Sequence, residues 1–172
     1  GAEERPIRRG DDGLVVRAAT PERALFAPPR GRANITVSAS RDAGGMLAAW
    51  LVGTEPPSPT DSGEICIFEI DADAIGPTTT ARTGIKAHHD PRLTTDMAEI
   101  TVPLHASRPH TWTAIWGDGE TTIGCDGVIV RRMPQAPGYP LFLMIDLFEI
   151  DVPSGAYPKS ATVHRVRSWA DR

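Results

Sequence analysis

The chain has 172 residues, enough for one domain with a buried core. Its formal net charge of -4 gives no general attraction for phosphate backbones or anionic lipid, which argues against nucleic acid and membranes as partners. No apolar run approaches the roughly 20 residues that cross a bilayer, and the opening GAEERPIRRGDDG lacks the apolar core of a signal peptide. The only two cysteines, Cys66 and Cys125, exclude a disulfide framework but leave a single bridge open.

Short β-rich runs, separated by 16 glycines and 16 prolines, fill most of the chain. No apolar pattern of helical period continues over three turns, so the sequence predicts an all-β protein. We expect residues 1–12 to be loosely held and residues 13–172 to form a single domain, a sandwich or jelly roll. The predicted strands are 13–18, 33–39, 46–53, 63–71, 80–88, 97–103, 110–117, 121–132, 140–150 and 162–169.

Two dipeptides predict tight hairpin turns. Asp118-Gly119 in WGDGE and Asp126-Gly127 in CDGVIV can adopt the left-handed backbone angles that such turns require. The three prolines of residues 53–63 exclude a central strand there, so this segment is predicted to loop over a rim of the fold.

The segment SGEICIFEID, residues 62–71, carries two glutamates five positions apart in an alternating strand. Side chains of a regular strand change face at every residue, so Glu64 and Glu69 should point to opposite sides. One extra residue, a β-bulge, would shift the alternation and place Glu64, Cys66 and Glu69 on one face, with Ile65 and Ile70 in the core. Such a carboxyl pair suits a retaining glycosidase, whereas without the bulge both glutamates are solvated surface residues.

Several blocks in order, AAWLVG, GEICIFE, HTWTAIWGDGETTIGCDGVIVRR and YPLFLMIDL, resemble family 16 of the glycoside hydrolases, which contains laminarinases, lichenases and related β-glucanases. The resemblance runs from about Arg32 to VHRVRSW near the C-terminus. It implies a concanavalin A-like β-sandwich, or jelly roll, of two antiparallel sheets with a polysaccharide cleft on its concave face. The implied activity is retaining, endo-acting hydrolysis of O-glycosidic bonds in a β-linked polysaccharide, first of all a β-glucan.

The family signature Glu-x-Asp-x-x-Glu assigns roles by resemblance. Glu64 takes the place of the nucleophile and Glu69 that of the general acid/base. Trp50 takes the place of an aromatic residue that lines the sugar cleft, although core packing is an equal alternative for it. His88 falls near the cleft, where it would contact sugar or Glu69. The remaining residues expected to bind substrate are His110 and Trp112, and core packing is the alternative for Trp112.

Two departures from the signature predict an impaired site. Cys66 replaces the central aspartate, so a neutral thiol stands in the carboxylate row and changes the proton balance of both glutamates. The tryptophan that commonly precedes the signature is missing as well. Asp146 replaces an asparagine, and we expect its carboxylate to substitute for the missing one if its strand lies beside the glutamate strand. The alternative function is therefore a catalytically impaired glycan-binding protein of the same fold.

The remaining expectations concern ligands and location. We expect a polysaccharide or oligosaccharide substrate, no cofactor, no metal and a monomeric chain. The place of the family's structural calcium aspartate is taken by His164, which does not suit a cation that prefers oxygen ligands. The adjacent His88 and His89 point to opposite faces of a strand, which disfavours a shared metal ion. The resemblance implies a secreted or extracellular protein.

Overall fold

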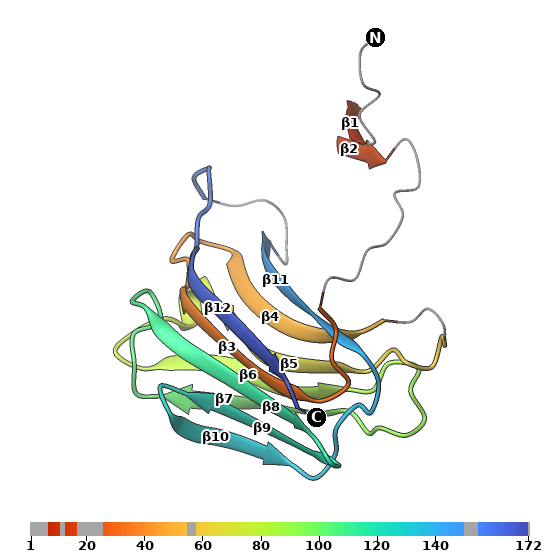
Figure 1. The fold of residues 1–172 in the computed structure, drawn as a ribbon. Coiled ribbons are helices and arrows are strands. Elements are labelled where there is room, and N and C mark those ends of the chain that lie inside the picture. Colours follow the sequence, from red (N-terminus) through yellow and green to blue (C-terminus); the bar gives the residue numbers. More distant parts are fainter. Residues whose placement is uncertain (1–6, 11–12, 17–25, 55–57, 150–154, 172) are drawn as a thin grey trace.

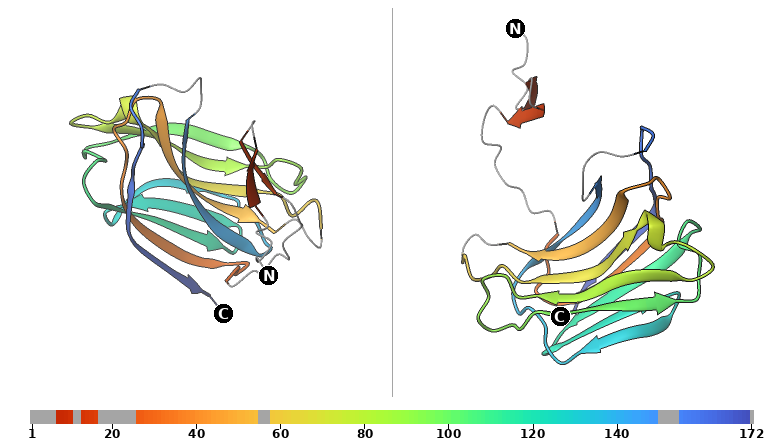
Figure 2. Two further views of the ribbon diagram at one scale, coloured as in Figure 1. Left: turned by 90° about the horizontal axis from the view of Figure 1, so that it is seen from above. Right: turned by 180° about the vertical axis from the view of Figure 1, so that it is seen from behind.

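The computed structural model describes residues 7–10, 13–16, 26–54, 58–149 and 155–171 (Figure 1). Two five-stranded antiparallel sheets face each other and form a sandwich, which confirms the predicted all-β fold. One sheet, with strand order β11-β4-β5-β6-β7, carries both glutamates and is called the glutamate sheet. The other, with strand order β10-β9-β8-β3-β12, is called the opposing sheet. The two sheets are seen from above and from behind in Figure 2.

The strand boundaries lie close to the predicted ones. The glutamate sheet contains β4 (Gly45–Gly53), β5 (Glu64–Asp71), β6 (Thr79–Lys86), β7 (Asp96–Val102) and β11 (Leu141–Glu149). The opposing sheet contains β3 (Gly31–Ser38), β8 (His110–Gly117), β9 (Glu120–Cys125), β10 (Val128–Met133) and β12 (Thr162–Ala170). A 3-10 turn, η1 (Ala72–Ala74), follows β5. Among the described residues, no helix has the length and apolar character needed to cross a bilayer.

Within the part of the chain that the structure describes, the two N-terminal strands pair with each other and not with the sandwich. β2 (Gly13–Val16), which lies within the predicted strand 13–18, pairs with β1 (Ile7–Gly10) in a separate two-stranded sheet. Residues 1–6 and 11–12 of the segment expected to be loosely held lie outside the described residues.

Both predicted hairpin turns are confirmed. Asp118 and Gly119 have φ angles of 49° and 77°, and Asp126 and Gly127 have φ angles of 47° and 81°. Two successive residues of positive φ are the geometry that joins twisted antiparallel strands tightly. The turn at 126–127 divides the single predicted strand 121–132 into β9 and β10.

The core fills the space between the two sheets. Its largest fully buried side chains come from both sheets, and the ring of Trp112 on β8 lies 5.2 Å from that of Phe68 on β5. In β3 and β8 buried residues alternate with more exposed ones, as in strands that turn one face to the core. These buried side chains form the half of the core that belongs to the opposing sheet. Cys66 and Cys125 are buried and free, so the single disulfide that the sequence left open is not formed.

Candidate active site

An extra residue in β5 brings the two glutamates to one face of the glutamate sheet. Phe68 and Cys66 pair with consecutive residues of β4, so Ile67 has no partner there. The register with β6 shifts at the same place. Ile67 and Phe68 both pack into the core, and the alternation beyond them is moved by one residue. The predicted bulge is confirmed, and it places Glu64, Cys66 and Glu69 on the side of the sheet that faces away from the core.

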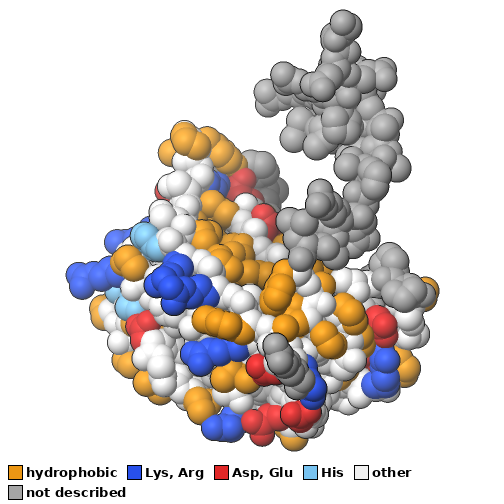
Figure 3. Space-filling view, viewed as in Figure 1, with side chains coloured by type: hydrophobic (Ala, Val, Ile, Leu, Met, Phe, Trp, Pro, Cys, Tyr) orange, Lys and Arg blue, Asp and Glu red, His pale blue; other side chains and the backbone are white. Residues whose placement is uncertain are grey.

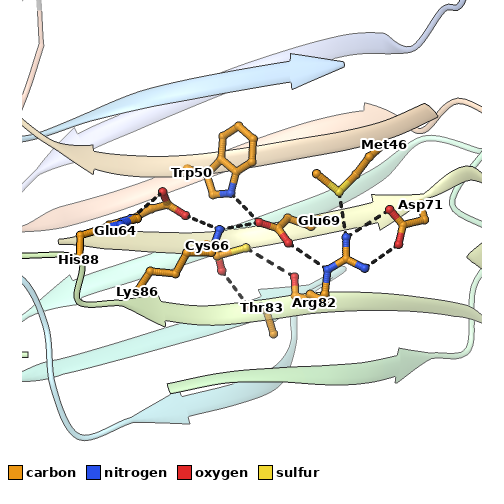
Figure 4. A network of polar contacts seen from close by, with 10 residues as sticks. All are labelled: Met46, Trp50, Glu64, Cys66, Glu69, Asp71, Arg82, Thr83, Lys86 and His88. Atoms are coloured by element: carbon orange, nitrogen blue, oxygen red, sulfur yellow. Dashed lines mark hydrogen bonds and ion pairs between the residues drawn. The ribbon is translucent and has the colours of Figure 1, made fainter. Parts of the chain in front are cut away.

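A lysine of β6 joins the two carboxylates (Figure 4). Lys86 Nζ lies 2.9 Å from Glu64 Oε1 and 2.7 Å from Glu69 Oε1. The two oxygens are therefore no farther apart than the sum of these distances, which is close to the about 5–5.5 Å between the carboxyl groups of retaining glycosidases. Burial opposes the charge of Lys86, but the hydrogen bonds and charges of the two glutamates outweigh it and raise the lysine pKa.

Glu69 accepts hydrogen bonds from three donors. Trp50 Nε1 and Lys86 Nζ donate to Oε1 at 3.1 and 2.7 Å, and Arg82 Nε donates to Oε2 at 3.0 Å. Burial is the largest single influence and raises the pKa of this carboxyl, but the hydrogen bonds from Lys86, Arg82 and Trp50 together lower the pKa below its usual value. Glu69 is therefore held in its ionised form.

Arg82 anchors the far end of the site. Its guanidinium donates to Asp71 Oδ2 and Oδ1 at 2.5 and 3.1 Å, in addition to the bond to Glu69. Its Nη2 also contacts Met46 Sδ at 2.9 Å. Because one planar guanidinium bridges two carboxylates, its position is fixed and it adds a second permanent positive charge beside Glu69.

Cys66 lies beneath the carboxylates and is fully buried. Its thiol donates to the backbone oxygen of Arg82 at 3.6 Å, and burial, together with the charge of Glu69, raises the thiol pKa. A thiol in such surroundings is neutral and inert, so Cys66 supplies no charge between the glutamates. It packs with Met46, Ala48 and Trp50 in a small apolar cluster on this face.

Trp50 and His88 complete the surroundings of the carboxylates. The Trp50 ring is 7% exposed, lies 6.0 Å from the Phe148 ring, and carries the Lys86 ammonium 5.6 Å from its centre. His88 Nε2 lies 3.3 Å from Glu64 Oε2. The imidazole therefore contacts Glu64 rather than Glu69, which corrects one of the two contacts expected for it.

The structure does not bring His110 and Trp112 to this site. Both lie on β8 of the opposing sheet, where Trp112 is fully buried in the core. His110 Nδ1 is 2.7 Å from Asp126 Oδ2 at the turn after β9. The core alternative holds for Trp112, because its ring fills the space between the sheets against Phe68.

Asp146 lies one strand farther from the glutamates than expected. Its strand, β11, pairs with β4, and β4 separates it from β5, so the condition under which Asp146 was expected to replace the missing carboxylate is not met. Asp146 is opposite Ala48, which is opposite Glu69. Two strand spacings of about 4.8 Å therefore separate Asp146 from Glu69.

A buried tyrosine connects the loops that flank the site. Tyr139 donates its hydroxyl hydrogen to Asp90 Oδ2 at 2.8 Å and accepts from the Gly63 backbone at 2.7 Å. Arg92 Nε donates to Asp90 Oδ1 at 2.7 Å. Burial opposes ionisation of Asp90, but these hydrogen bonds lower its pKa. The network holds the loop that contains His88 against the residue before Glu64.

Sequence reasoning missed Arg82 and Lys86, the two cations of the site. Arg82, Gly84 and Lys86 occupy alternate positions of the strand TTARTGIK. In the pairing of β6 with β5, Arg82 is opposite Glu69 and Lys86 is opposite Glu64. This period of two was visible in the sequence. Only the register of β6 against the bulged strand reveals that both side chains meet the carboxylates.

Comparisons with known proteins define the class of fold. The sequence matches no protein-family model and no curated protein. Among solved structures, an endo-β-galactosidase from Clostridium perfringens that releases GlcNAcα1-4Gal has a TM-score of 0.71 and 20% identity, covering 84% of this chain but 39% of that chain. The catalytic domain of an endo-1,3-β-glucanase (laminarinase) from Thermotoga petrophila RKU-1 has a TM-score of 0.71 and 16% identity, covering 96% of this chain and 74% of that one.

A β-glucanase from Bacillus licheniformis is similar over 97% of this chain and 83% of its own, with a TM-score of 0.70 and 14% identity. At identities of 14–20%, this structural similarity shows the fold alone. The chain therefore has a jelly-roll fold like that of these β-glucanases and of this endo-β-galactosidase.

Proposed function

We propose that the protein binds a β-linked polysaccharide over the face that carries Trp50, Glu64 and Glu69, and that at neutral pH it hydrolyses this glycan only weakly. The observation that carries the proposal is the position of Lys86, whose ammonium is within 2.9 Å of one carboxylate and 2.7 Å of the other. The fold of the neighbouring glycosidases supports a glycan as the ligand.

The chemistry of retention explains the weak turnover. One carboxyl must attack the sugar carbon as an anion while the other, protonated, donates to the departing oxygen. A carboxyl with an ordinary pKa of about 4.3 is protonated in roughly one molecule in 500 at pH 7, and Glu69 has a pKa below its usual value. Lys86 and Arg82 therefore oppose protonation of Glu69, which a general acid needs. Cys66 supplies no neighbouring negative charge that would raise the Glu69 pKa again.

An apolar surface beside the carboxylates supports sugar binding. Met144, the cross-strand partner of Trp50 on β11, is 39% exposed, and Phe148 packs against the Trp50 ring. Sugar rings present apolar C–H faces as well as hydroxyls, and such ligands suit aromatic and apolar surfaces edged by a few polar groups. Glu64, His88 and Lys86 supply those polar groups.

The second candidate function is a retaining endo-acting hydrolase, with Glu64 as nucleophile and Glu69 as acid/base. The bulge favours it, because it brings both carboxylates to one face, where each has an oxygen within 2.9 Å of the Lys86 ammonium. Lys86 is the last residue of β6 and its side chain is 30% exposed. A bound sugar that displaces the Lys86 ammonium from the carboxylates would therefore allow hydrolysis.

Binding and release are measured on the same samples to test the proposal. Affinity electrophoresis in gels that contain laminarin, lichenan, agarose or xylan reports binding, and reducing-sugar release reports hydrolysis. We expect retardation by at least one glycan, weakened in Trp50→Ala, with release far below the about 1–1000 per second of ordinary enzymes. Retardation by none of the four glycans would contradict binding. Fast release that disappears in Glu64→Gln would favour the hydrolase.

A further inference from the structure

The outward face of the opposing sheet, on the side away from the core, presents an ordered row of side chains across all five strands. Cross-strand pairing connects them in sequence, from β12 to β10. The members of this row are Trp169, Arg32, Ile115, Thr122 and Arg132. Residues paired directly across antiparallel strands point to the same face, so this row forms one continuous surface.

A shallow groove follows this row. The next row contains Gly124 between Thr113 on β8 and Ile129 on β10, two residues along β8 and β9 and three along β10, where the register shifts. Gly124, which has no side chain, lines the groove together with Thr113 and Ile129. The groove has a volume of about 310 Å³ and extends from Arg32 to Arg132.

The charge of this face is opposite to that of the glutamate sheet. Arg32, Arg165 and Arg167 are exposed and have no acidic partner among the described residues, and Glu120 is the only acidic residue in the strands of the opposing sheet. The strands of the glutamate sheet contain seven acidic residues, although the whole chain carries -4. Basic and hydrophobic side chains lie side by side over this face in Figure 3.

Arg32 is already oriented for a ligand. Its guanidinium lies 5.8 Å from the centre of the Trp169 ring, and its Nε donates to Asn34 Oδ1 at 2.9 Å. The Trp169 side chain remains 43% exposed. A guanidinium held by an aromatic ring and an amide loses little freedom when it binds an anion, and it can hold a carboxylate or sulfate by two hydrogen bonds.

We propose that this outward face is a second binding site, which takes an acidic polysaccharide whose sugars carry carboxylate or sulfate groups. Arg32, Arg165 and Arg167 hold the anionic groups, and the exposed Trp169 ring and Ile115 hold the apolar face of a sugar. Three arginines without an acidic partner among the described residues are few compared with the about 6–10 phosphate contacts that a DNA-binding protein makes, so the count disfavours a nucleic acid as the ligand. The site is separate from the glutamates, so it does not depend on the function proposed for them.

Affinity electrophoresis with polygalacturonate, dextran sulfate and neutral laminarin tests the proposal on the whole chain. The variant Arg32→Gln/Arg167→Gln removes two exposed charges from the face. The matched control Arg41→Gln/Arg108→Gln removes two exposed arginines from loops outside it. We expect one or both acidic polymers to bind the wild type, about tenfold weaker binding in the double variant, unchanged binding in the control, and weakening by salt.

Trp169→Ala separates a glycan site from general attraction to polyanions, because it removes the sugar platform and keeps every charge. We expect it to weaken polygalacturonate or dextran sulfate binding several-fold. Equal binding by the Arg32→Gln/Arg167→Gln variant, binding of neither acidic polymer, or equally tight binding of a DNA duplex or phosphatidylserine vesicles would overturn the proposal. Melting curves of all variants verify folding, which exposed substitutions should preserve.

Discussion

Replacement of Lys86 by methionine removes the charge that joins the two glutamates and keeps most of the apolar length of the side chain. Wild-type Lys86 Nζ lies within 2.9 Å of both carboxylates and 5.6 Å from the centre of the Trp50 ring. The substitution therefore leaves two carboxylates facing each other on one side of the sheet, with Arg82 as the remaining cation at Glu69.

The expected cost follows from these contacts. Removing one partner of a largely buried ion pair costs about 3–5 kcal/mol of unfolding free energy, because an uncompensated charge remains. This cost should be largest at pH 7 and shrink as pH falls below about 5, where one glutamate of the variant takes up a proton. A contacting cation lowers a carboxyl pKa by about one unit or more, so its loss raises the protonated fraction at least about tenfold.

Chemical denaturation from pH 4 to pH 8 and reducing-sugar release from laminarin and lichenan measure the two effects. Lys86→Arg is the matched control, since it keeps a positive charge at the same position. We expect Lys86→Met to be less stable than Lys86→Arg at pH 7 and to release sugar at least about tenfold faster than the wild type near pH 5. A Lys86→Met variant that is as stable as the wild type at pH 7 and releases sugar no faster would show that Lys86 neither stabilises the carboxylate pair nor keeps Glu69 ionised.

Three further outcomes are expected. Tyr139→Phe leaves the Gly63 N–H without its acceptor and Asp90 without one donor, so the free energy of unfolding should fall by about 1–3 kcal/mol, measurable by urea denaturation. Trp112→Ala should lower the free energy of unfolding by about 3–5 kcal/mol, because it leaves a cavity in the core. Trp112→Phe should retain glycan binding in affinity gels. Loss of binding in a folded Trp112→Phe variant would instead place this residue in the sugar site. The pKa values of Glu69 and Asp90 are lowered in the folded state, so these groups contribute stability that is present above their unfolded pKa values of about 4 and is lost as pH falls through the folded values. The melting temperature should therefore decline steeply below about pH 4. A melting temperature that stays constant from about pH 6 to pH 2 would contradict these shifts.

The strands and the bulge could be predicted because their signals are local. Alternation marks each strand, Asp-Gly pairs mark both hairpins, and the odd spacing of Glu64 and Glu69 requires an extra residue if they are to share a face. These features depend on neighbours a few positions away in the chain, where steric rules act directly.

The composition of the site depended on pairing between distant strands. Lys86 meets both carboxylates through the register of β6, and Asp146 is kept from them by the insertion of β4 between its strand and β5. Trp112 was assigned to the sugar site by resemblance, but its position in β8 points it into the core. Sheet order and register are set by the packing of the whole domain, which alternation in one segment does not determine.

The ionisation of Glu69 tests the account most directly. Selective labelling of glutamate side-chain carbons, with assignment through Glu69→Gln, allows its carboxyl to be titrated by NMR in the wild type and in Lys86→Met. We expect a titration midpoint below the ordinary glutamate value of about 4.3 in the wild type and a higher midpoint in the variant. A wild-type midpoint near neutral pH would contradict this expectation, because Glu69 would then be a carboxyl ready to act as a general acid.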